Sequence, residues 1–269
     1  MRNCGVILAC FACLSLVGPH VAVRGENVGL TQNDVTIILA QVPLEAPIVY
    51  FRCVNGVLQD QRVVVVATDL YFTGPKKTRA AKVYIFTSST RGWSLAFQTD
   101  MDERLAAQGL PADWEISLSR IEFADVDGDG LKEIIVFWNS EPSQSISLTQ
   151  FQTILHIFDY SQEEHQFYEA TAERLVYNTF RERAFLLNVD CDPEIEIVMF
   201  EEIWVQDTCV VCAKPYRVEV WTFQGGKFCM DPSWNKGQAL ETDEFLSLQN
   251  PCDFAKLLRD LVLRCYLSP

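Results

Sequence analysis

The sequence predicts an all-β protein, and three observations support this prediction. Apolar, β-branched runs of strand length recur along the chain, the clearest of them at residues 62–67. A run of alternating aspartates at residues 125–133 leads into another such strand, and a weaker copy of this run begins 63 positions later. Repeats of this size, with several strands in each, are typical of propeller blades or a similar radial array. We therefore expect a β-propeller-like array of about three to four blades over residues 26–239, whether or not it closes into a ring.

The first predicted unit occupies the stretch up to about residue 100. Its strands are expected at residues 35–40, 48–53, 62–67, 82–86 and 93–97, with a polar turn at 74–77. The segment that follows, residues 101–112, is predicted to form a short helix or an irregular crossover.

The second and third predicted units share one spacing. Strands are expected at residues 121–123, 133–138, 155–158 and 166–168 in the second unit, and at 185–187, 197–200, 218–221 and 226–228 in the third. Asn188 follows Asp125 by 63 positions, and Val218 follows Leu155 by the same 63. Two markers at one offset favour a true repeat over two unrelated strand–turn–strand segments. Val83 precedes Leu155 by 72 positions, which predicts an insertion in the first unit.

Both ends of the chain differ from the repeats. Residues 1–25 contain an early arginine, an apolar stretch at 5–17 and small residues near the end, which together predict a cleaved signal peptide. We therefore expect an exported protein that is secreted, periplasmic or at the cell surface. The Ile-Leu-Ala-Cys run at 7–10 leaves a lipid-anchored form open, and no membrane span beyond the leader is predicted. Residues 240–269 are expected to form a C-terminal helical segment, with an amphipathic helix at 251–266.

Charge and cysteine content restrict the partners and the chemistry. The formal net charge of −14 repels nucleic acid and anionic membrane surfaces, so neither is expected as a partner. Export predicts that some of the cysteines outside the leader form disulfides. These cysteines are Cys53, Cys191, Cys209, Cys212, Cys229, Cys252 and Cys265. Cys209 and Cys212 form a CxxC pair, for which structural disulfides are favoured over a zinc site or a redox pair.

The aspartate run predicts cation binding. Calcium takes about six to eight hard oxygen ligands in a flexible shell. Alternating Asp125, Asp127 and Asp129 place three carboxylates on the inside of a tight loop. Two glycines within the run let the backbone curl, so that the carbonyl of Leu131 can also point inward. Glu133 then closes the ligand shell, and Ca²⁺ is the expected ion.

The residues after the loop separate this site from other calcium motifs. A helix–loop–helix calcium site needs a bidentate glutamate at its last position, where this chain has Val136 inside a strand-like run. That class of site is therefore excluded. Magnesium stays an alternative, although it would use fewer protein ligands and more water.

Residues 123–136, with the sequence FADVDGDGLKEIIV, resemble the FG-GAP or VCBS repeat, the calcium-loop blade of integrin-α-type β-propellers. The resemblance implies that the loop joins two strands of a blade and that calcium makes the turn rigid. The metal ligands that it implies are Asp125, Asp127, Asp129 and Glu133. It covers one blade well, a second blade in degenerate form and a third only by its hairpin.

The weaker copy of the loop departs from this pattern. The residues at its ligand positions are Asn188, Asp190, Asp192 and Glu196. Pro193 and Cys191 replace the two glycines, and proline cannot supply a positive φ angle. The sequence leaves open whether this second loop binds a metal.

The function predicted from these features is that of a non-enzymatic binding or scaffold protein with a calcium-stabilised loop. Its partner would be a protein or a glycan that the sequence does not identify. The alternative is a carbohydrate-binding module of the same fold, in which Trp114, Trp204 and Trp234 stack on sugars. An enzyme would need a paired general acid and base, which the three histidines and scattered carboxylates do not suggest.

Overall fold

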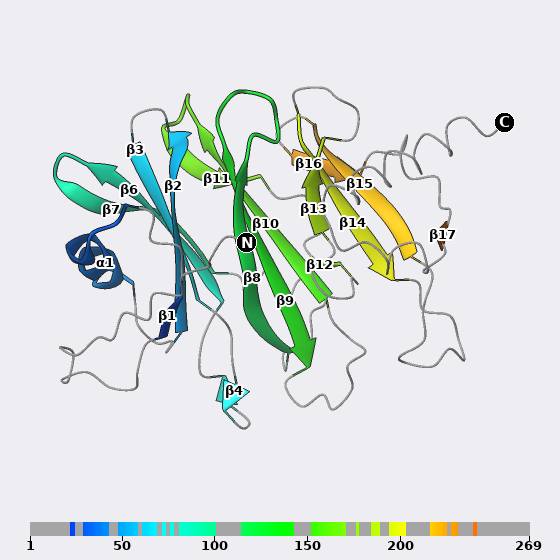
Figure 1. The fold of residues 1–269 in the computed structure, drawn as a ribbon, viewed down its shortest axis with the longest axis horizontal. Coiled ribbons are helices and arrows are strands. Elements are labelled where there is room, and N and C mark those ends of the chain that lie inside the picture. The colour runs from blue at the N-terminus through cyan, green and yellow to red at the C-terminus, as the bar shows by residue number, and fades with distance from the viewer. Residues whose placement is uncertain are drawn as a thin grey trace, which may run out of the picture.

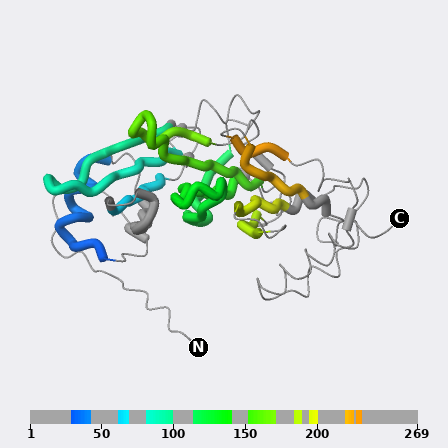
Figure 2. The backbone as a smooth tube through the Cα atoms, turned by 90° about the horizontal axis from the view of Figure 1, so that it is seen from above, coloured from blue at the N-terminus to red at the C-terminus, as the bar shows by residue number. Residues whose placement is uncertain are grey.

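The described residues of the chain form an all-β protein with three sheets side by side (Figure 1). The computed structural model describes residues 22–24, 29–42, 48–58, 61–68, 72–73, 76–77, 81–100, 114–142, 152–170, 176–177, 184–188, 194–202, 216–224, 227–230 and 239–240. Figure 2 shows the chain passing from α1 at one end through the first, second and third sheets in order. The all-β prediction is therefore confirmed, whereas the arrangement of the sheets as propeller blades stays a prediction.

The first sheet has the strand order β1-β2-β3-β6-β7, antiparallel except for the β1–β2 pair. Its strands are β1 (Ala22–Arg24), β2 (Ile48–Leu58), β3 (Gln61–Thr68), β6 (Lys82–Ser89) and β7 (Gly92–Asp100). A separate two-stranded sheet pairs β4 (Phe72–Thr73) with β5 (Lys76–Lys77), and β5 takes up the last two residues of the polar turn predicted at 74–77.

The second and third sheets are antiparallel and repeat one plan. The second sheet consists of β8 (Trp114–Ala124), β9 (Glu133–Pro142), β10 (Gln152–Ser161) and β11 (Gln166–Glu169), with β12 (Val176–Tyr177) paired to β10. The third consists of β13 (Ala184–Leu187), β14 (Glu196–Glu202), β15 (Tyr216–Gln224) and β16 (Lys227–Met230), with β17 (Ala239–Leu240) paired to β15. All the predicted strands but one overlap these observed strands.

The offset seen in the sequence also relates the strand pairings of these two sheets. Ala124 pairs with Glu133, and the residues 63 positions later, Leu187 and Glu196, pair in the same way. The pair of Ile134 with Phe158 recurs as Ile197 with Trp221, again at an offset of 63 for both residues. The second and third sheets therefore share hydrogen-bond register as well as sequence pattern.

The strand predicted at residues 35–40 is wrong, because this stretch belongs to the helix α1 (Gln32–Leu39). Thr31 and Asp34 form a reciprocal cap at its start: the Asp34 N–H donates to Thr31 Oγ1 at 3.1 Å, and the Thr31 N–H donates to Asp34 Oδ2 at 2.8 Å. A capping box of this kind satisfies backbone donors that a helix otherwise leaves unpaired. The cap therefore outweighs the strand preference of the β-branched run that follows it.

Helix α1 covers the outer face of the first sheet. The helix contacts Trp93 of β7 through a hydrogen bond, which the Trp93 Nε1–H donates to Asp34 Oδ1 at 2.8 Å, and through apolar packing. The apolar contact joins Val35, Ile38 and Val42 to Val64, Val66, Tyr84, Phe86 and Trp93. Helical spacing places Val35 and Ile38 on one face of α1, and Val42 joins them from the turn after the helix, so the helix forms where it can bury that face.

The second sheet is buried on both faces. Toward the first sheet it presents Ile134, Val136 and Trp138, which pack with the inner side chains of β3 and β6. Toward the third sheet it presents Ile135 and Phe137, which pack with the inner side chains of β13, β14 and β15. A strand covered on both sides takes a continuous apolar run instead of an alternating one, as β9 does.

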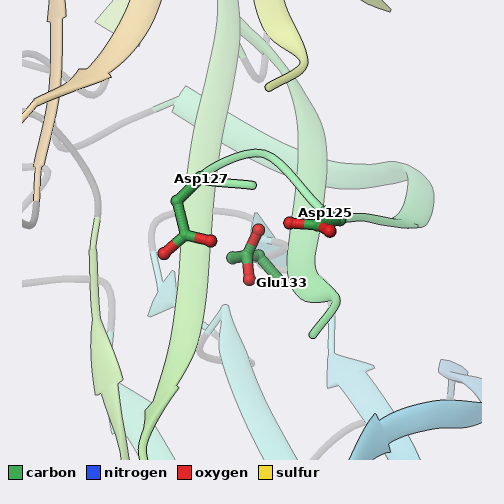
Figure 3. A group of neighbouring side chains, drawn as sticks. All are labelled: Asp125, Asp127 and Glu133. Carbon is green, nitrogen blue, oxygen red and sulfur yellow. The ribbon is translucent and has the colours of Figure 1, made fainter. Parts of the chain in front are cut away.

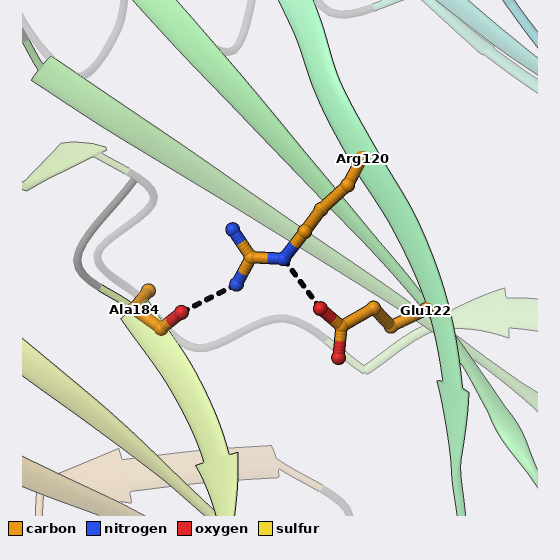
Figure 4. Close-up of polar contacts among 3 residues, drawn as sticks. All are labelled: Arg120, Glu122 and Ala184. Atoms are coloured by element: carbon orange, nitrogen blue, oxygen red, sulfur yellow. Dashed lines mark hydrogen bonds and ion pairs between the residues drawn. The ribbon is translucent and has the colours of Figure 1, made fainter. Parts of the chain in front are cut away.

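Arg120 connects the second sheet to the third (Figure 4). Its Nε forms an ion pair with Glu122 Oε1, and its Nη2–H donates to the carbonyl oxygen of Ala184 on β13. The guanidinium carbon lies 3.7 Å from the centroid of the Phe137 ring, a cation–π contact. The β8–β9 register shifts between Leu118 and Arg120, and such a bulge redirects the side chains beside it.

We expect Arg120→Ala to lower the free energy of unfolding by about 2–3 kcal/mol, because it removes a charge-assisted hydrogen bond and the ring contact together. Equilibrium urea unfolding measures this loss. Arg91→Ala is the matched control, since Arg91 is exposed in the turn between β6 and β7 and should change the free energy by less than about 0.5 kcal/mol. Equal effects of the two substitutions would contradict the inter-sheet role of Arg120.

Several predictions concern residues that the structure does not describe. The expected crossover at 101–112 and the expected helix at 251–266 lie outside the described residues. Most of the predicted leader lies outside them as well, although β1 falls within its last residues and pairs in parallel with β2. Within the described part of the chain, no helix combines the length and the apolar character needed to cross a membrane.

Candidate metal centre

The loop between β8 and β9 turns through two glycines in the left-handed region. Gly128 has a φ angle of 74° and Gly130 one of 89°. Nothing lies within 4 Å of a Cβ built on Gly130, so its requirement for glycine comes from the backbone angle and not from space. The sequence prediction that these glycines let the loop curl is confirmed.

Three backbone N–H groups of the curled loop donate to its own aspartates. The Asp129 N–H donates to Asp127 Oδ1 at 3.0 Å, and the Gly130 N–H donates to Asp125 Oδ2 at 3.0 Å. The Leu131 N–H donates to Asp129 Oδ1 at 2.7 Å. These bonds orient the aspartates by local structure alone, before any ion is considered.

Asp125, Asp127 and Glu133 converge on one point (Figure 3). One carboxylate oxygen from each lies within 4.8 Å of the other two. Asp129 lies outside this group, because its side chain is exposed and turned back to Leu131. The ligand roles predicted for Asp129 and for the Leu131 carbonyl therefore stay predictions.

Glu133 is the most deeply buried member of the group, with an exposed fraction of 0%. Its Oε2 accepts the Val126 N–H at 2.6 Å. Within the described residues, its Oε1 accepts no hydrogen bond, and neither does Asp125 Oδ1. A buried carboxylate oxygen without a partner is energetically costly, and a cation would remove that cost.

Burial raises the pKa of Glu133 from an ordinary value of 4.5 to about 8. The backbone bond from Val126 opposes this rise, and the negative charges of Asp127, Asp159 and Asp125 add to it. Burial also raises the pKa of Asp127, from 3.8 to about 6, and neighbouring carboxylates again add to the rise. Without a cation, the group therefore binds protons that an ordinary carboxylate would have released.

The group of three carboxylates could hold a metal ion. Its donors are hard oxygens, which suit calcium, magnesium or manganese better than zinc or copper. Two of these oxygens, Asp125 Oδ1 and Glu133 Oε1, are buried and accept no hydrogen bond among the described residues. The donor set therefore fits a cation. The geometry does not identify which metal it would be.

Two residues beside these three carboxylates, Asp159 and Tyr168, are not predicted from the sequence. Asp159 is buried near the end of β10, and its Oδ2 accepts a hydrogen bond from the Tyr168 hydroxyl on β11. Its Oδ1 accepts the Tyr160 N–H. The signal that could have found Asp159 is its position one residue after the apolar run 155–158, opposite the expected start of β9.

The second predicted loop is only partly described. Asn188 is exposed and Glu196 is buried, while Asp190 and Asp192 lie outside the described residues. Only two of the four predicted ligands are among the described residues, so the second site stays a prediction.

The structure describes only some of the tryptophans and cysteines that the sequence offers as other candidate sites. Trp93, Trp114 and Trp221 are all buried, so Trp114 does not form part of an exposed platform for sugars. Trp204 and Trp234 lie outside the described residues, as do Cys209 and Cys212. Cys229 is an exposed free thiol, and the predicted disulfides stay predictions.

No protein-family model matches the chain, and no curated protein matches it either. The resemblance of residues 123–136 to the FG-GAP or VCBS repeat therefore stays a prediction. The fold and the site together define the class of protein. It is an all-β protein in which three carboxylates at the loop between two strands could hold a metal ion.

Proposed function

We propose that this chain is an exported, non-enzymatic binding or scaffold protein whose fold is stabilised by calcium in the 125–133 loop. The observation that carries the proposal is the fully buried Glu133, whose Oε1 has no hydrogen bond among the described residues and which lies beside Asp125 and Asp127. Calcium is the favoured ion because it accepts several carboxylates in irregular geometry, whereas magnesium demands a near-ideal octahedron and keeps its water.

The position of the carboxylate group favours a structural ion over a catalytic one. Glu133 begins β9, Asp125 follows the end of β8, and Val126 between them is buried. An ion held there would join two neighbouring strands at the edge of the core shared with the third sheet. A catalytic metal instead keeps an open position for water or substrate, and a ligand with no exposed surface offers little room for one.

The binding role rests on the predicted export and on the resemblance of the loop to a calcium-bearing blade. A rigid sheet assembly outside the cell is suited to present loops to a protein or glycan partner. A protein partner is favoured over a glycan, since the buried Trp114 does not support a sugar platform.

Chelation tests the proposal on the full chain. We expect EDTA to lower the melting temperature by roughly 5–10 °C relative to excess calcium, because saturation near 100 times the Kd adds about 2.7 kcal/mol. Asp127→Ala should abolish this difference. Glu163→Gln, an exposed carboxylate in the turn between β10 and β11, should leave it unchanged. A melting temperature that chelation does not shift would remove the calcium claim.

A further inference from the structure

Asp159 and Tyr168 form a directly opposed pair on the hairpin of β10 and β11. The Tyr168 hydroxyl donates to Asp159 Oδ2, while the Tyr160 N–H donates to Asp159 Oδ1. Asp159 as a whole residue is only 8% exposed. Both of its oxygens are thus held in place inside the protein, on a strand that the aspartate loop does not include.

The strand register brings this pair to the same face as Glu133. Phe158 pairs with Ile134, so the next residues outward, Asp159 and Glu133, stand opposite each other on β10 and β9. Residues opposed in this way point to one face of the sheet, with Cβ atoms about 4.5–5.5 Å apart. That face is the one packed toward the third sheet, because Tyr168 and Ile157 both belong to its core.

We propose that the cation site extends beyond the loop: Asp159 is a fourth carboxylate that sets the affinity for calcium, and Tyr168 is the residue that positions it. The inference rests on the proposed function, because it assigns residues to that same site. Asp159 lies outside the group whose oxygens are within 4.8 Å of one another, so it acts on the ion through its charge and through ion-bound water.

The independent sign of a ligand here is the unpartnered oxygen of Glu133. Glu133 Oε1 is buried and accepts no hydrogen bond among the described residues, while its carboxylate lies between Asp125 and Asp127 (Figure 3). A further buried carboxylate on the same face makes the metal-free arrangement more repulsive, because like charges interact strongly where water is excluded. A divalent ion reverses the sign of that interaction, so the fourth negative charge then raises affinity.

The hydrogen bond that its hydroxyl donates to Asp159 Oδ2 assigns the positioning role to Tyr168. A phenol is protonated at physiological pH, and burial, followed by the bond to Asp159, raises the pKa of Tyr168 further. The corresponding pair in the third sheet is Thr222 with Cys229, which offers no carboxylate. The extended site therefore belongs to the first loop and not to its weaker copy.

Calorimetric titration of the full chain with calcium chloride tests the inference. We expect Asp159→Asn to weaken calcium binding by about 10–100-fold and Tyr168→Phe by about 10-fold, the range usual for groups that support metal ligands. Tyr160→Phe is the matched control for the hydroxyl, because Tyr160 neighbours Asp159 but packs on the opposite face. Glu163→Gln is the matched control for the charge; both controls should bind within about 2-fold of the wild type.

The melting temperature in EDTA separates positioning from a general structural role. Tyr168→Phe should lose calcium affinity while its melting temperature in EDTA stays near that of the wild type; a structural residue would lower both. Wild-type binding with unchanged affinity in Asp159→Asn and Tyr168→Phe would overturn this inference and leave the proposed function standing. A wild type that binds no calcium would overturn both. If Asp159→Asn does not fold, Tyr168→Phe decides the question.

Discussion

Glu133→Gln is expected to melt below the wild type in excess calcium and above it in EDTA at about pH 9. In calcium, the substitution replaces a charged ligand by a neutral amide and should reduce affinity by about 100-fold. The amide oxygen can still accept the Val126 N–H, so the loop keeps its shape. The difference between the two conditions therefore reports the ion and not the fold.

The reversal in EDTA follows from the raised pKa of Glu133. Its pKa of about 8 in the folded protein exceeds the ordinary 4.5, so the folded state binds the proton more tightly than the unfolded state. Stability is then highest at low pH and falls as the pH rises from about 4.5 to about 8. Glutamine does not titrate, so the variant does not lose stability over this pH range through residue 133. The pKa of Asp127 is raised to about 6, so its titration lowers the stability of both proteins at a lower pH, between about 3.8 and about 6.

Thermal unfolding at about pH 5, 7 and 9, with calcium and with EDTA, measures both effects. In the wild type, the stabilisation by calcium should grow with pH across this window, because the ion displaces protons from the carboxylates. Glu163→Gln controls for the loss of one surface charge. Parallel melting curves for Glu133→Gln and the wild type across the pH range in EDTA would show that Glu133 does not titrate as expected.

Phe137→Ala is expected to lower the free energy of unfolding by about 3–5 kcal/mol. Its ring has no exposed surface and fills the core between the second and third sheets. It also lies beneath the Arg120 guanidinium, so its removal leaves a cavity and a cation without its aromatic contact.

Trp138→Ala tests the other face of the same strand. It should lower the free energy of unfolding by a similar amount, because Trp138 is equally buried against the first sheet. Met230→Ala on β16 is the control, since Met230 is 47% exposed and should change stability by less than about 0.5 kcal/mol. Equilibrium urea unfolding, with the slope compared between variants, gives the values. A loss below about 1 kcal/mol for either core variant would contradict burial of the second sheet on both faces.

Local sequence predicts well where one short segment decides the structure. The run at 62–67 has four consecutive β-branched valines at its centre and lies within β3. The sequence predicts Asp125, Asp127 and Glu133 together because a single loop carries all three. The error at 35–40 has the same origin: Val35, Ile37 and Ile38 suit a strand locally, but the capping box of Thr31 and Asp34 starts a helix that includes them.

The sequence by itself determined the all-β class, most of the strands and the carboxylate loop, because each depends on residues close together in the chain. Only the tertiary structure decided that Asp159 and Tyr168 face Glu133, since that depends on how β9, β10 and β11 align. It also decided that Glu133 is buried, because burial depends on how the strands pack and not on the loop sequence alone. Burial and register act between segments, and they shift the pKa values and leave carboxylate oxygens without a hydrogen bond among the described residues.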